Sequence, residues 1–442
     1  MDVAFVGLGK LGLPVAVATS LSKEFRVKGY DVNPKIVKKW IYPHREEGRH
    51  SDETFQDCLE RSPLEVVKTL EEVVNGAELI FVAVQTPHEE KFSGSTRLTT
   101  YDRKDFNYSY LVKSCKELSS VVKKDQTVSI ISTVLPGTIR REVVPVLGKV
   151  CNLVYNPFFI AMGTVVKDFL NPEFVLVGSE SEDSVEPIRQ FYFKLLGTDP
   201  KFQGVKFPMS YESAELTKVS YNLFISQKIV FANALMEISH KTPGCNVDDV
   251  TTVLGKATDR LISPKYMSGG VGDGGGCHPR DAIAMSYLAR KLGLSFNPFE
   301  VVSEAREKQA EWLCDVFVDE AGDLPKVILG RSFKPQTRIS DGSCALLIAD
   351  TLRGYGHSFC QYDPYIDFMT EEEMWSSDVL RGDKPVAVLI ATKHECFTRW
   401  SFPWGSIVVD PFRYIPDQEG VRVIRVGIGK TNMGWIDDLW GG

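Results

Sequence analysis

A glycine-rich turn near the start of the chain constrains the fold more than any other stretch. Residues 3–6 are apolar, and residues 7–12 read Gly-Leu-Gly-Lys-Leu-Gly before an apolar run that passes through Ala16 and Leu21. This is the GxGxxG pattern in a strand, turn and helix context, where glycines allow the tight turn, the approach of a pyrophosphate and close helix packing. We therefore predict a parallel α/β domain that binds a dinucleotide; the alternative is a chance glycine-rich turn.

A carboxylate after the next strand indicates which dinucleotide binds. Residues 26–30 form the second predicted strand, and Asp31 follows it directly. In this fold a carboxylate at that place bonds the adenosine ribose hydroxyls and repels a 2′-phosphate. The sequence therefore favours NAD over NADP.

Two threonines follow further buried strands of the same domain, which we expect to end near residue 205. Residues 79–84 and 127–131 are continuous apolar runs, as is typical of parallel strands covered on both faces. Thr86 and Thr133 follow these runs, at the strand ends where ligands bind in a doubly wound sheet. Ordinary turn chemistry would also explain Thr86.

A long helix comes next in the chain. Residues 212–241 contain neither proline nor glycine, and Glu215, Lys218 and Asn222 recur at spacings of three and four, so they share one face. A helix of this length bridges two domains or forms a dimer seam. Taken alone, Lys218 would be an ordinary solvated lysine.

Further along the chain, one cysteine directly follows three consecutive glycines. Residues 274–281 read Gly-Gly-Gly-Cys-His-Pro-Arg-Asp, and an apolar run typical of a helix follows. Cys277 thus lies near the amino end of a helix, where the helix dipole favours a thiolate, and Asp281 lies one turn further on. This layout suits a nucleophile with a proton acceptor beside it. A buried structural cysteine after a flexible loop is the alternative.

The last third repeats the alternation of strands and helices. Strands are predicted at residues 327–330, before 363 and at 386–391, with a helix at 345–352, but there is no second glycine fingerprint. Lys334 follows the first of these strands and either meets a phosphate or is a surface lysine. We predict an α/β protein with two Rossmann-like doubly wound domains joined by a long central helix.

Length and composition limit the remaining classes. The chain has 442 residues, and we divide it into an NAD-binding domain (1–205), a central helical domain with the cysteine loop (206–310) and a second Rossmann-like domain (311–442). A net charge of −7 without a basic block argues against a nucleic-acid partner. Neither a signal peptide nor a long apolar run is recognisable, so we expect no membrane partner. Nine cysteines without CxxC spacing favour reduced thiols in a cytoplasm over disulfides or a metal site.

Taken together, these segments resemble the UDP-glucose/GDP-mannose dehydrogenase family, in the family's order and over essentially the whole chain. The matching segments are residues 7–12 with Asp31, 85–87 (Gln-Thr-Pro), 132–138 (Ser-Thr-Val-Leu-Pro-Gly-Thr), 214–222 (Ala-Glu-Leu through Asn222), 274–281, 333–335 (Phe-Lys-Pro) and 362–364 (Tyr-Asp-Pro).

The resemblance implies a reaction and a role for each matching residue. In the family a cysteine attacks the aldehyde made by a first hydride transfer, a second hydride leaves, and the thioester is hydrolysed to a uronic acid. Cys277 would be that nucleophile, Lys218 and Asn222 would steady oxyanion charge, and Asp281 with Thr133 would handle water and protons. A Lys and Asn pair suits this chemistry, because the intermediates carry negative charge on oxygen.

The motifs and the resemblance together give the expected contacts. The residues expected to bind NAD are Gly7, Gly9, Leu11, Gly12, Asp31, Thr86 and Thr133. A lysine that follows Asp31, Lys35 beside Ile36, is also expected to bind NAD. Those expected to bind the nucleotide sugar are Lys218, Asn222, Arg260, Tyr266, Gly274 and Lys334. The expected assembly is a homodimer through the long helix.

Three departures from the family pattern bear on the last step and on the substrate. The family's Asn-Pro-Glu-Phe is Asn-Pro-Phe-Phe here, so Phe158 replaces the glutamate associated with thioester hydrolysis. Asp273 stands where the family has an aromatic residue, and residues 338–341 read Arg-Ile-Ser-Asp instead of Asp-Asp-x-Arg. Two alternatives follow: a relative that stops at the aldehyde or thioester or passes the acyl group to an acceptor other than water, and a catalytically dead NAD- and nucleotide-binding protein.

Overall fold

The chain divides into two compact units, which we describe separately. The computed structural model describes residues 1–33, 55–95, 103–197, 208–261, 265–266, 268–272, 275–367, 371–375 and 384–428. Unit 1 comprises Met1–His88 and Asp105–Tyr221, and unit 2 comprises Glu89–Lys104 and Asn222–Gly442. The division into domains at residues 205 and 310 stays a prediction.

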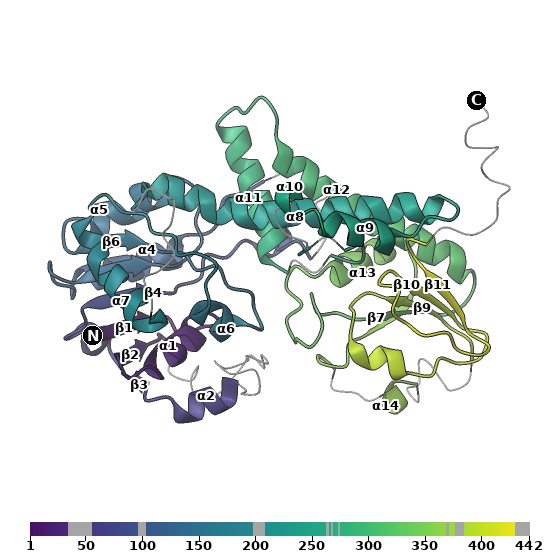
Figure 1. Ribbon diagram of the computed structural model, residues 1–442, viewed down its shortest axis with the longest axis horizontal. Helices are drawn as coiled ribbons and strands as arrows, with labels where there is room; N and C mark the ends of the chain where they lie inside the picture. Colours follow the sequence, from purple (N-terminus) through teal and green to yellow (C-terminus); the bar gives the residue numbers. More distant parts are fainter. Residues whose placement is uncertain are drawn as a thin grey trace. The chain divides into compact units, whose positions relative to one another are not determined.

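Unit 1 is built on a six-stranded parallel sheet in the order β3-β2-β1-β4-β5-β6 (Figure 1). This is the doubly wound order, with its switch point between β1 and β4. The strands are β1 (Asp2–Val6), β2 (Arg26–Tyr30), β3 (Glu65–Val66), β4 (Leu79–Val82), β5 (Thr127–Ile130) and β6 (Asn152–Tyr155). The strands predicted at 3–6, 26–30 and 127–131 are confirmed to within one residue at each end, whereas the strand predicted at 79–84 ends two residues earlier, at Val82.

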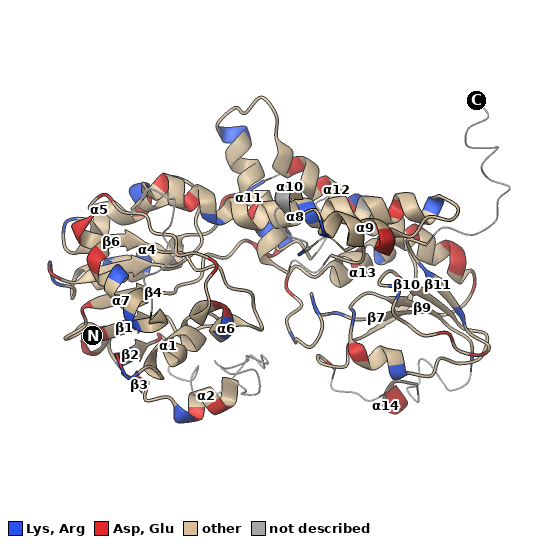
Figure 2. Cartoon of the chain, viewed as in Figure 1, with Lys and Arg blue, Asp and Glu red and all other residues tan. Residues whose placement is uncertain are grey.

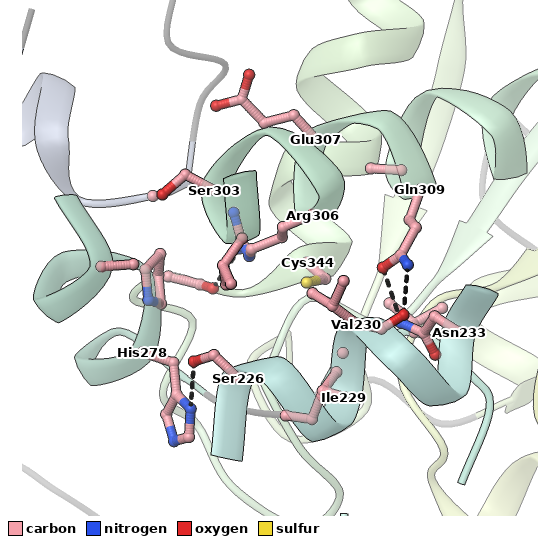
Figure 3. Close-up of a pocket in the computed structure, with 18 of the residues that line it drawn as sticks. Ser226, Ile229, Val230, Asn233, His278, Ser303, Arg306, Glu307, Gln309 and Cys344 are labelled. Atoms are coloured by element: carbon pink, nitrogen blue, oxygen red, sulfur yellow. Dashed lines mark hydrogen bonds between the residues drawn. The ribbon is translucent and has the colours of Figure 1, made fainter. Parts of the chain in front are cut away.

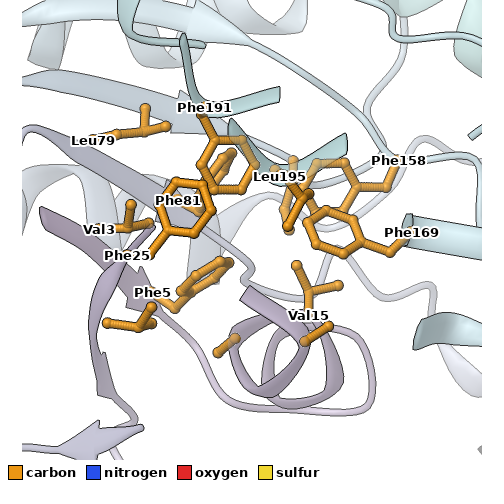
Figure 4. Close-up of a cluster of buried hydrophobic side chains, with 14 of the residues drawn as sticks. Val3, Phe5, Val15, Phe25, Leu79, Phe81, Phe158, Phe169, Phe191 and Leu195 are labelled. Atoms are coloured by element: carbon orange, nitrogen blue, oxygen red, sulfur yellow. The ribbon is translucent and has the colours of Figure 1, made fainter. Parts of the chain in front are cut away.

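Helices cover both faces of this sheet. They are α1 (Gly12–Ser20), α2 (Phe55–Arg61), α3 (Leu70–Val74), α4 (Ser109–Ser119), α5 (Val144–Leu147), α6 (Val165–Leu170) and α7 (Glu186–Leu196). Every residue of α1 is buried, as expected of a helix that is apolar all round. On one face of the sheet, rings from β1, β4 and α7 pack together, with Phe81 5.0 Å from both Phe5 and Phe191 between ring centroids (Figure 4).

The predicted long helix is α8 (Tyr211–Lys241), 31 residues without an interruption. Its first turns belong to unit 1 and the remainder, from Asn222, to unit 2. At 1.5 Å per residue it is about 46 Å long. Within the part of the chain that the structure describes, no helix combines the length and apolarity that a membrane span requires.

Unit 2 contains a helical part that carries the cysteine loop. Its helices are α9 (Val247–Gly255), α10 (Thr258–Leu261), α11 (Cys277–Lys291) and α12 (Pro298–Ala321). The last two form a packed helical hairpin, and Asn297 caps α12 by accepting a hydrogen bond from the N–H of Glu300. Helix α11 begins at Cys277 itself, which confirms the predicted position of this residue at a helix start.

The second sheet of the molecule is also parallel, in the order β11-β10-β9-β7-β8. Its elements are β7 (Lys326–Leu329), α13 (Cys344–Gly354), β8 (Phe359–Tyr362), α14 (Glu371–Trp375), β9 (Ala387–Ile390), β10 (Ile407–Asp410) and β11 (Arg422–Arg425). The prediction of a second doubly wound α/β region is therefore confirmed. Basic and acidic residues are interspersed over both units (Figure 2), in keeping with the small net charge of −7.

Candidate functional site

The glycine turn of unit 1 forms a backbone cradle at the switch point of its sheet. Gly7 has φ +96°, and a Cβ there would lie 2.6 Å from the carbonyl oxygen of Ala83; a Cβ on Gly12 would overlap the carbonyl oxygen of Gly7. A Cβ on Gly9, in contrast, would meet nothing within 4 Å. Leu11 is the N-cap residue of α1. Two glycines thus permit tight packing, while Gly9 leaves open space at a helix amino end, which suits a pyrophosphate.

Asp31 is tied to this turn. Its Oδ2 accepts a hydrogen bond from the N–H of Leu8 at 2.8 Å, and its Oδ1 accepts one from the N–H of Asn33 at 2.8 Å. The carboxylate therefore has a defined orientation directly after β2. Cradle and carboxylate together fit the two ends of an adenosine diphosphate moiety, as expected for NAD. The lysine expected to bind NAD, Lys35 next to Ile36, lies outside the described residues.

Two hydrogen bonds join the loops that carry Thr86 and Thr133. The buried Thr86 hydroxyl donates to the carbonyl oxygen of Thr133 at 2.7 Å, and the Ser132 hydroxyl donates to the carbonyl oxygen of Val84. These bonds join the loops after β4 and β5. Thr86 thus bonds a loop 47 residues further on, which is not local turn chemistry, and its contact with NAD stays a prediction.

Glu215 has a role that the sequence did not reveal. Its carboxylate accepts hydrogen bonds from the backbone N–H groups of Gly137 and Ile139, at 2.5 and 2.7 Å, so it ties α8 to the turn that follows Thr133. Burial raises the pKa of Glu215 to about 7, although the two N–H groups lower it. The signal was present, because Glu215 lies three residues before Lys218 on the same helical face.

Lys218 is buried in unit 1 and is not a solvated lysine. Only 7% of it is exposed; its Nζ donates to the carbonyl oxygen of Phe158 at 2.7 Å and lies 4.6 Å from the centroid of the Phe159 ring. The ring of Phe158 points into the aromatic core of unit 1, 5.8 Å from Phe81 and 5.3 Å from Phe169 (Figure 4). The residue that replaces the expected glutamate therefore presents its backbone carbonyl to Lys218 and its ring to the core.

Cys277 and Asp281 lie on the first two turns of α11 but in different environments. All nine cysteines are described, none forms a disulfide, and Cys277 is the exposed one. Asp281 has no exposed surface; its Oδ2 accepts a hydrogen bond from Nδ2 of Asn222 at 2.7 Å, and Nε of Arg280 lies 3.7 Å from its Oδ1. Within unit 2 the structure thus pairs Asn222 with Asp281, and helical spacing places Lys218 one turn before Asn222 on α8.

The glycine-rich loop before Cys277 is held by residues far away in the sequence. Asn233 accepts a hydrogen bond from the N–H of Gly270 at 3.0 Å, and Arg413 donates to the carbonyl oxygen of Gly269 at 2.9 Å. Arg413 also pairs with Asp248 through two hydrogen bonds of 2.8 Å. Sequence reasoning missed these residues, because no local pattern marks a side chain that supports a loop 37 or 144 residues away.

A cavity of about 70 Å³ lies beside this loop, within unit 2 (Figure 3). It is lined by α8, α11, α12 and the start of α13. The lining is largely apolar, but it includes Asn233, His278, Arg306 and Cys344. Nδ1 of His278 lies 3.1 Å from the hydroxyl of Ser226. Figure 3 marks this hydrogen bond with a dashed line. The volume exceeds what several water molecules need, and the two sides of Cys277, at Gly275 and His278, both face it.

The remaining predicted substrate residues are only partly described. Lys334 is half-buried, with Nζ 5.4 Å from the centroid of the Phe333 ring. Tyr266 is 37% exposed and has φ +63°, which is uncommon for a residue with a bulky side chain and indicates local strain. Gly274, Asp273 and the side chain of Arg260 lie outside the described residues. Among the described residues no group of three or more His, Cys, Asp or Glu side chains could hold a metal ion.

Comparisons with known proteins match two parts of this chain to one family. Residues 1–196 match the model of the UDP-glucose/GDP-mannose dehydrogenase family, NAD binding domain, and residues 212–308 match that of the central domain. A UDP-glucose 6-dehydrogenase of Rickettsia conorii is 26% identical over 96% of this chain and 98% of its own length. A GDP-mannose 6-dehydrogenase of Pseudomonas putida is 26% identical over 83% and 82%.

Solved structures show the same fold. A UDP-glucose dehydrogenase from Pyrobaculum islandicum has a TM-score of 0.75 and 24% identity, covering 97% of this chain and 98% of its own. A UDP-D-ManNAc dehydrogenase from Pyrococcus horikoshii also has a TM-score of 0.75, with 22% identity, over 97% and 99%.

Proposed function

Because the chain belongs to the UDP-glucose/GDP-mannose dehydrogenase family, we propose that it oxidises the C6 hydroxyl of a nucleotide sugar, UDP-glucose or a close analogue, to the uronic acid. Nucleotide-sugar 6-dehydrogenase activity with NAD is what this family and the curated relatives share. The observation that carries the finer proposal is Cys277, the exposed first residue of α11 after a loop held on several sides.

NAD, when bound, accepts the hydride in each of the two oxidations. We assign its pyrophosphate to the open space at Gly9 and the amino end of α1, and its ribose hydroxyls to Asp31. Thr86 and Glu215 hold the loops after β4 and β5, at the strand ends where a bound dinucleotide meets the sheet.

Cys277 carries the second oxidation. Its thiolate adds to the carbonyl carbon of the aldehyde and forms a thiohemiacetal; loss of hydride from that carbon gives a thioester. Water then releases the uronic acid and restores the thiol. Cys277 is the exposed first residue of α11, where a substrate can reach its sulfur.

Lys218 and Asn222 steady the negative charge that develops on the substrate oxygen. The carbonyl oxygen of Phe158 orients the ammonium of Lys218, and the carboxylate of Asp281 orients the amide of Asn222. Donors that are fixed in advance stabilise an oxyanion without reorganising during the reaction. Asp281 and Thr133 remain our candidates for moving protons and positioning water.

The thioester step is where this chain should differ from its family. With Phe158 in the core, the position of the family's glutamate offers no base, and a positioned general base typically contributes a rate factor of about 10² to 10⁴. We expect an acyl adduct on Cys277 and a burst of NADH that matches the active sites, followed by a slow phase.

Intact-protein mass spectrometry after mixing with substrate and NAD tests this step. A sugar-sized addition is expected on the wild-type chain and not on Cys277→Ser, which should still perform the first hydride transfer. Fast steady turnover without an adduct would mean that another group activates water. Release of an aldehyde after a single NADH would remove the thioester role of Cys277, and rapid adduct loss to an added amine or thiol would indicate a different acyl acceptor.

The substrate is identified by a panel of UDP-, GDP- and TDP-sugars assayed for NADH. We expect sustained production of NADH with a UDP-hexose and a lower rate with the GDP- and TDP-sugars. No NADH from any member of the panel, with NAD binding intact, would leave the binding-protein alternative.

We also propose a homodimer through α8 and a cytoplasmic location. Phe224, Phe231 and Ile238 recur at intervals of seven along α8 and are 49%, 52% and 59% exposed. An apolar stripe at this spacing suits a second copy of the same helix. The Phe231→Glu variant should be monomeric by sedimentation, whereas Phe193→Glu, at an equally exposed ring of unit 1, should not change the mass. The cytoplasm agrees with nine described cysteines of which none forms a disulfide.

A further inference from the structure

A segment from the first quarter of the chain packs in unit 2. Glu89–Lys104 follows β4 and the Thr86 loop, yet it belongs to unit 2, and the chain returns to unit 1 at Asp105. The structure describes residues 89–95 and 103–104 of it. Lys104 forms an ion pair with Glu89, which joins the two ends of the segment.

One end of the segment lies against the first turn of α11. Gly94 has φ +79°, and a Cβ there would lie 2.5 Å from both Cβ and Cγ of Pro279. Real Cβ atoms do not approach a neighbour so closely, so only glycine allows this contact without a shift. Pro279 is two residues after Cys277.

The next residue of the segment holds the turn that supports Gly276, the N-cap residue of α11. The hydroxyl of Ser95 accepts a hydrogen bond from the N–H of Gly342 at 3.1 Å, and Arg306 donates to the carbonyl oxygen of Gly342 at 2.9 Å. A Cβ on Gly342 would lie 2.7 Å from the nitrogen of Gly276, so these two backbones touch. Cys277 therefore lies between two supported residues. Pro279 contacts Gly94 of the segment, and Gly276 contacts Gly342, which bonds Ser95 of the segment.

The other end of the segment is anchored near the far end of α11. The side chain of Arg103 is 7% exposed and forms an ion pair with Glu300. Glu300 also accepts hydrogen bonds from the hydroxyl of Ser286 and, at 2.8 Å, from Arg290, both on α11. The described parts of the segment thus touch α11 at its first turn and, through Glu300, at its last turns.

We propose that the described parts of this segment, residues 89–95 and 103–104, position Cys277 for the second oxidation, with Gly94 and Ser95 as the positioning residues. This inference rests on the proposed function, because it gives the segment a role in the thiol step. A nucleophile reacts only from a near-attack position, and a displacement of about 1 Å costs up to about 10²-fold in rate. Contacts on both sides of Cys277 fix its backbone, and the backbone determines where the reacting sulfur can lie.

The test uses Gly94→Ala with a matched control in the same unit. Gly356 has φ +81°, close to that of Gly94, but a Cβ there would meet nothing within 4 Å, so Gly356→Ala has the same backbone strain without the collision. The first measurement is the rate of Cys277 alkylation by iodoacetamide as a function of pH, in the full chain. Cys277 is the exposed cysteine among nine described ones, and Cys277→Ser gives the background.

The expected result is selective. Gly94→Ala should change the alkylation rate about tenfold or more, and with a nucleotide sugar it should slow formation of the acid by ~10² while retaining the first hydride transfer, so that aldehyde accumulates. Gly356→Ala should behave as wild type in both assays. Ser95→Ala should change the alkylation rate and the rate of acid formation in the same direction as Gly94→Ala, by a smaller factor. Ser95→Thr, which keeps the hydroxyl, should restore both rates.

Two outcomes separate this inference from the proposed function. If Gly94→Ala and Ser95→Ala match Gly356→Ala in alkylation rate, pH profile and product ratio, the segment does not position Cys277. If the wild type reduces no NAD with any nucleotide sugar, the proposed function fails, while the alkylation comparison still decides the contact. Should Gly94→Ala fail to fold, Ser95→Ala alone provides the decision.

Discussion

In unit 1 the first strand, β1, runs into Gly7, whose N–H donates to the carbonyl oxygen of Tyr30 at the end of β2, at 2.8 Å. In unit 2 the first strand, β7, runs into Gly330, whose N–H donates to the carbonyl oxygen of Tyr362 at the end of β8, at 2.6 Å. Both glycines have positive φ; Gly7 packs against Ala83, directly after β4, and Gly330 packs against Thr392, two residues after β9. The two sheets therefore build their switch points in the same way.

The carboxylate after the second strand distinguishes the two regions. Asp31 bonds the N–H of Leu8 and stands beside the open space at Gly9. Asp363, at the corresponding place, is completely buried: it accepts hydrogen bonds from Ser332 and contacts Nε2 of His394 at 3.1 Å.

The difference shows how one topology serves two purposes. Where the crevice is left open, the sheet offers a backbone cradle to a ligand; where His394 fills it, the same crevice becomes a polar core. The loop from β7 to α13 is then free for other contacts, and it packs on the cysteine loop, with Phe333 against Gly275 and Gly342 against Gly276.

The largest effect expected from this comparison is on stability. Asp363→Ala leaves His394 and the N–H groups of Arg331 and Ser332 without their acceptor, and breaking a buried pair of this kind costs about 3–5 kcal/mol. Unit 2 should unfold at much lower denaturant, as hydrogen exchange resolved by unit would show. NAD affinity in unit 1 should not change; an equal loss in Asp31→Ala would break the comparison.

Gly9→Ala tests whether the open space at Gly9 holds the pyrophosphate of NAD. A Cβ there meets nothing within 4 Å, so the stability without cofactor should stay within about 0.5 kcal/mol of the wild type. NAD should nevertheless bind about tenfold or more weakly, since the methyl group occupies the space where a pyrophosphate must approach. Unchanged affinity by calorimetry would mean that the cofactor lies elsewhere.

Asp31 should govern the choice of cofactor. Asp31→Asn keeps an oxygen acceptor for only one of the two N–H groups, of Leu8 or Asn33, and it loses the charge that repels a 2′-phosphate. The preference for NAD over NADP should fall by roughly tenfold, or about 1.4 kcal/mol, in paired binding titrations. If discrimination persists in both Asp31→Asn and Asp31→Ala, the ribose is held by other residues.

A further effect concerns the sign of the pKa shift in the two buried carboxylates. For Asp363, burial raises the pKa, but His394 and the N–H groups of Ser332 and Arg331 outweigh it, so the pKa is lowered and its stabilisation is lost only as pH falls below 3.8. For Glu215 the pKa is raised from 4.5 to about 7, so ionisation opposes folding. Between pH 4.5 and 7 the folded state holds a proton that the unfolded state has released.

Glu215→Gln removes this titration. Relative to the variant, the unfolding free energy of the wild type should decrease as pH rises from 4.5 to about 7, by at most about 1.4 kcal/mol per pH unit. Denaturant curves at three pH values measure it. A difference that is constant with pH would show that Glu215 is ionised throughout.

Local sequence was sufficient to predict the helices and strands and some of the single residues at their ends. The turn at Gly7, the strand before Asp31, the uninterrupted α8 and Cys277 at the start of α11 all follow from periodicity and glycine placement. Spacing also predicted Asp281 as a proton acceptor beside Cys277. In the structure Asn222, from another helix, engages it, and a four-residue spacing contains no information about such a partner.

Contacts between distant segments could not be predicted. Phe158 was recognised as a missing base, but whether its ring faced a substrate or the core depended on Phe81 and Phe169, on other elements. The contact of Gly94 with Pro279 joins residues that share no motif, and glycine there looks like any loop glycine.

The path of the chain sets an order for its assembly during translation. Ser95 is made 247 residues before Gly342, its hydrogen-bond partner, which at 5–20 residues per second is a delay of roughly 10 to 50 s. Unit 1 can close its core once Tyr211 and Ala214 have emerged from the ribosome, but residues 89–104 must wait for α11, α12 and the turn at Gly342. A nascent chain that stalls in this interval has completed unit 1, while Ser95 and Arg103 still lack their partners Gly342 and Glu300.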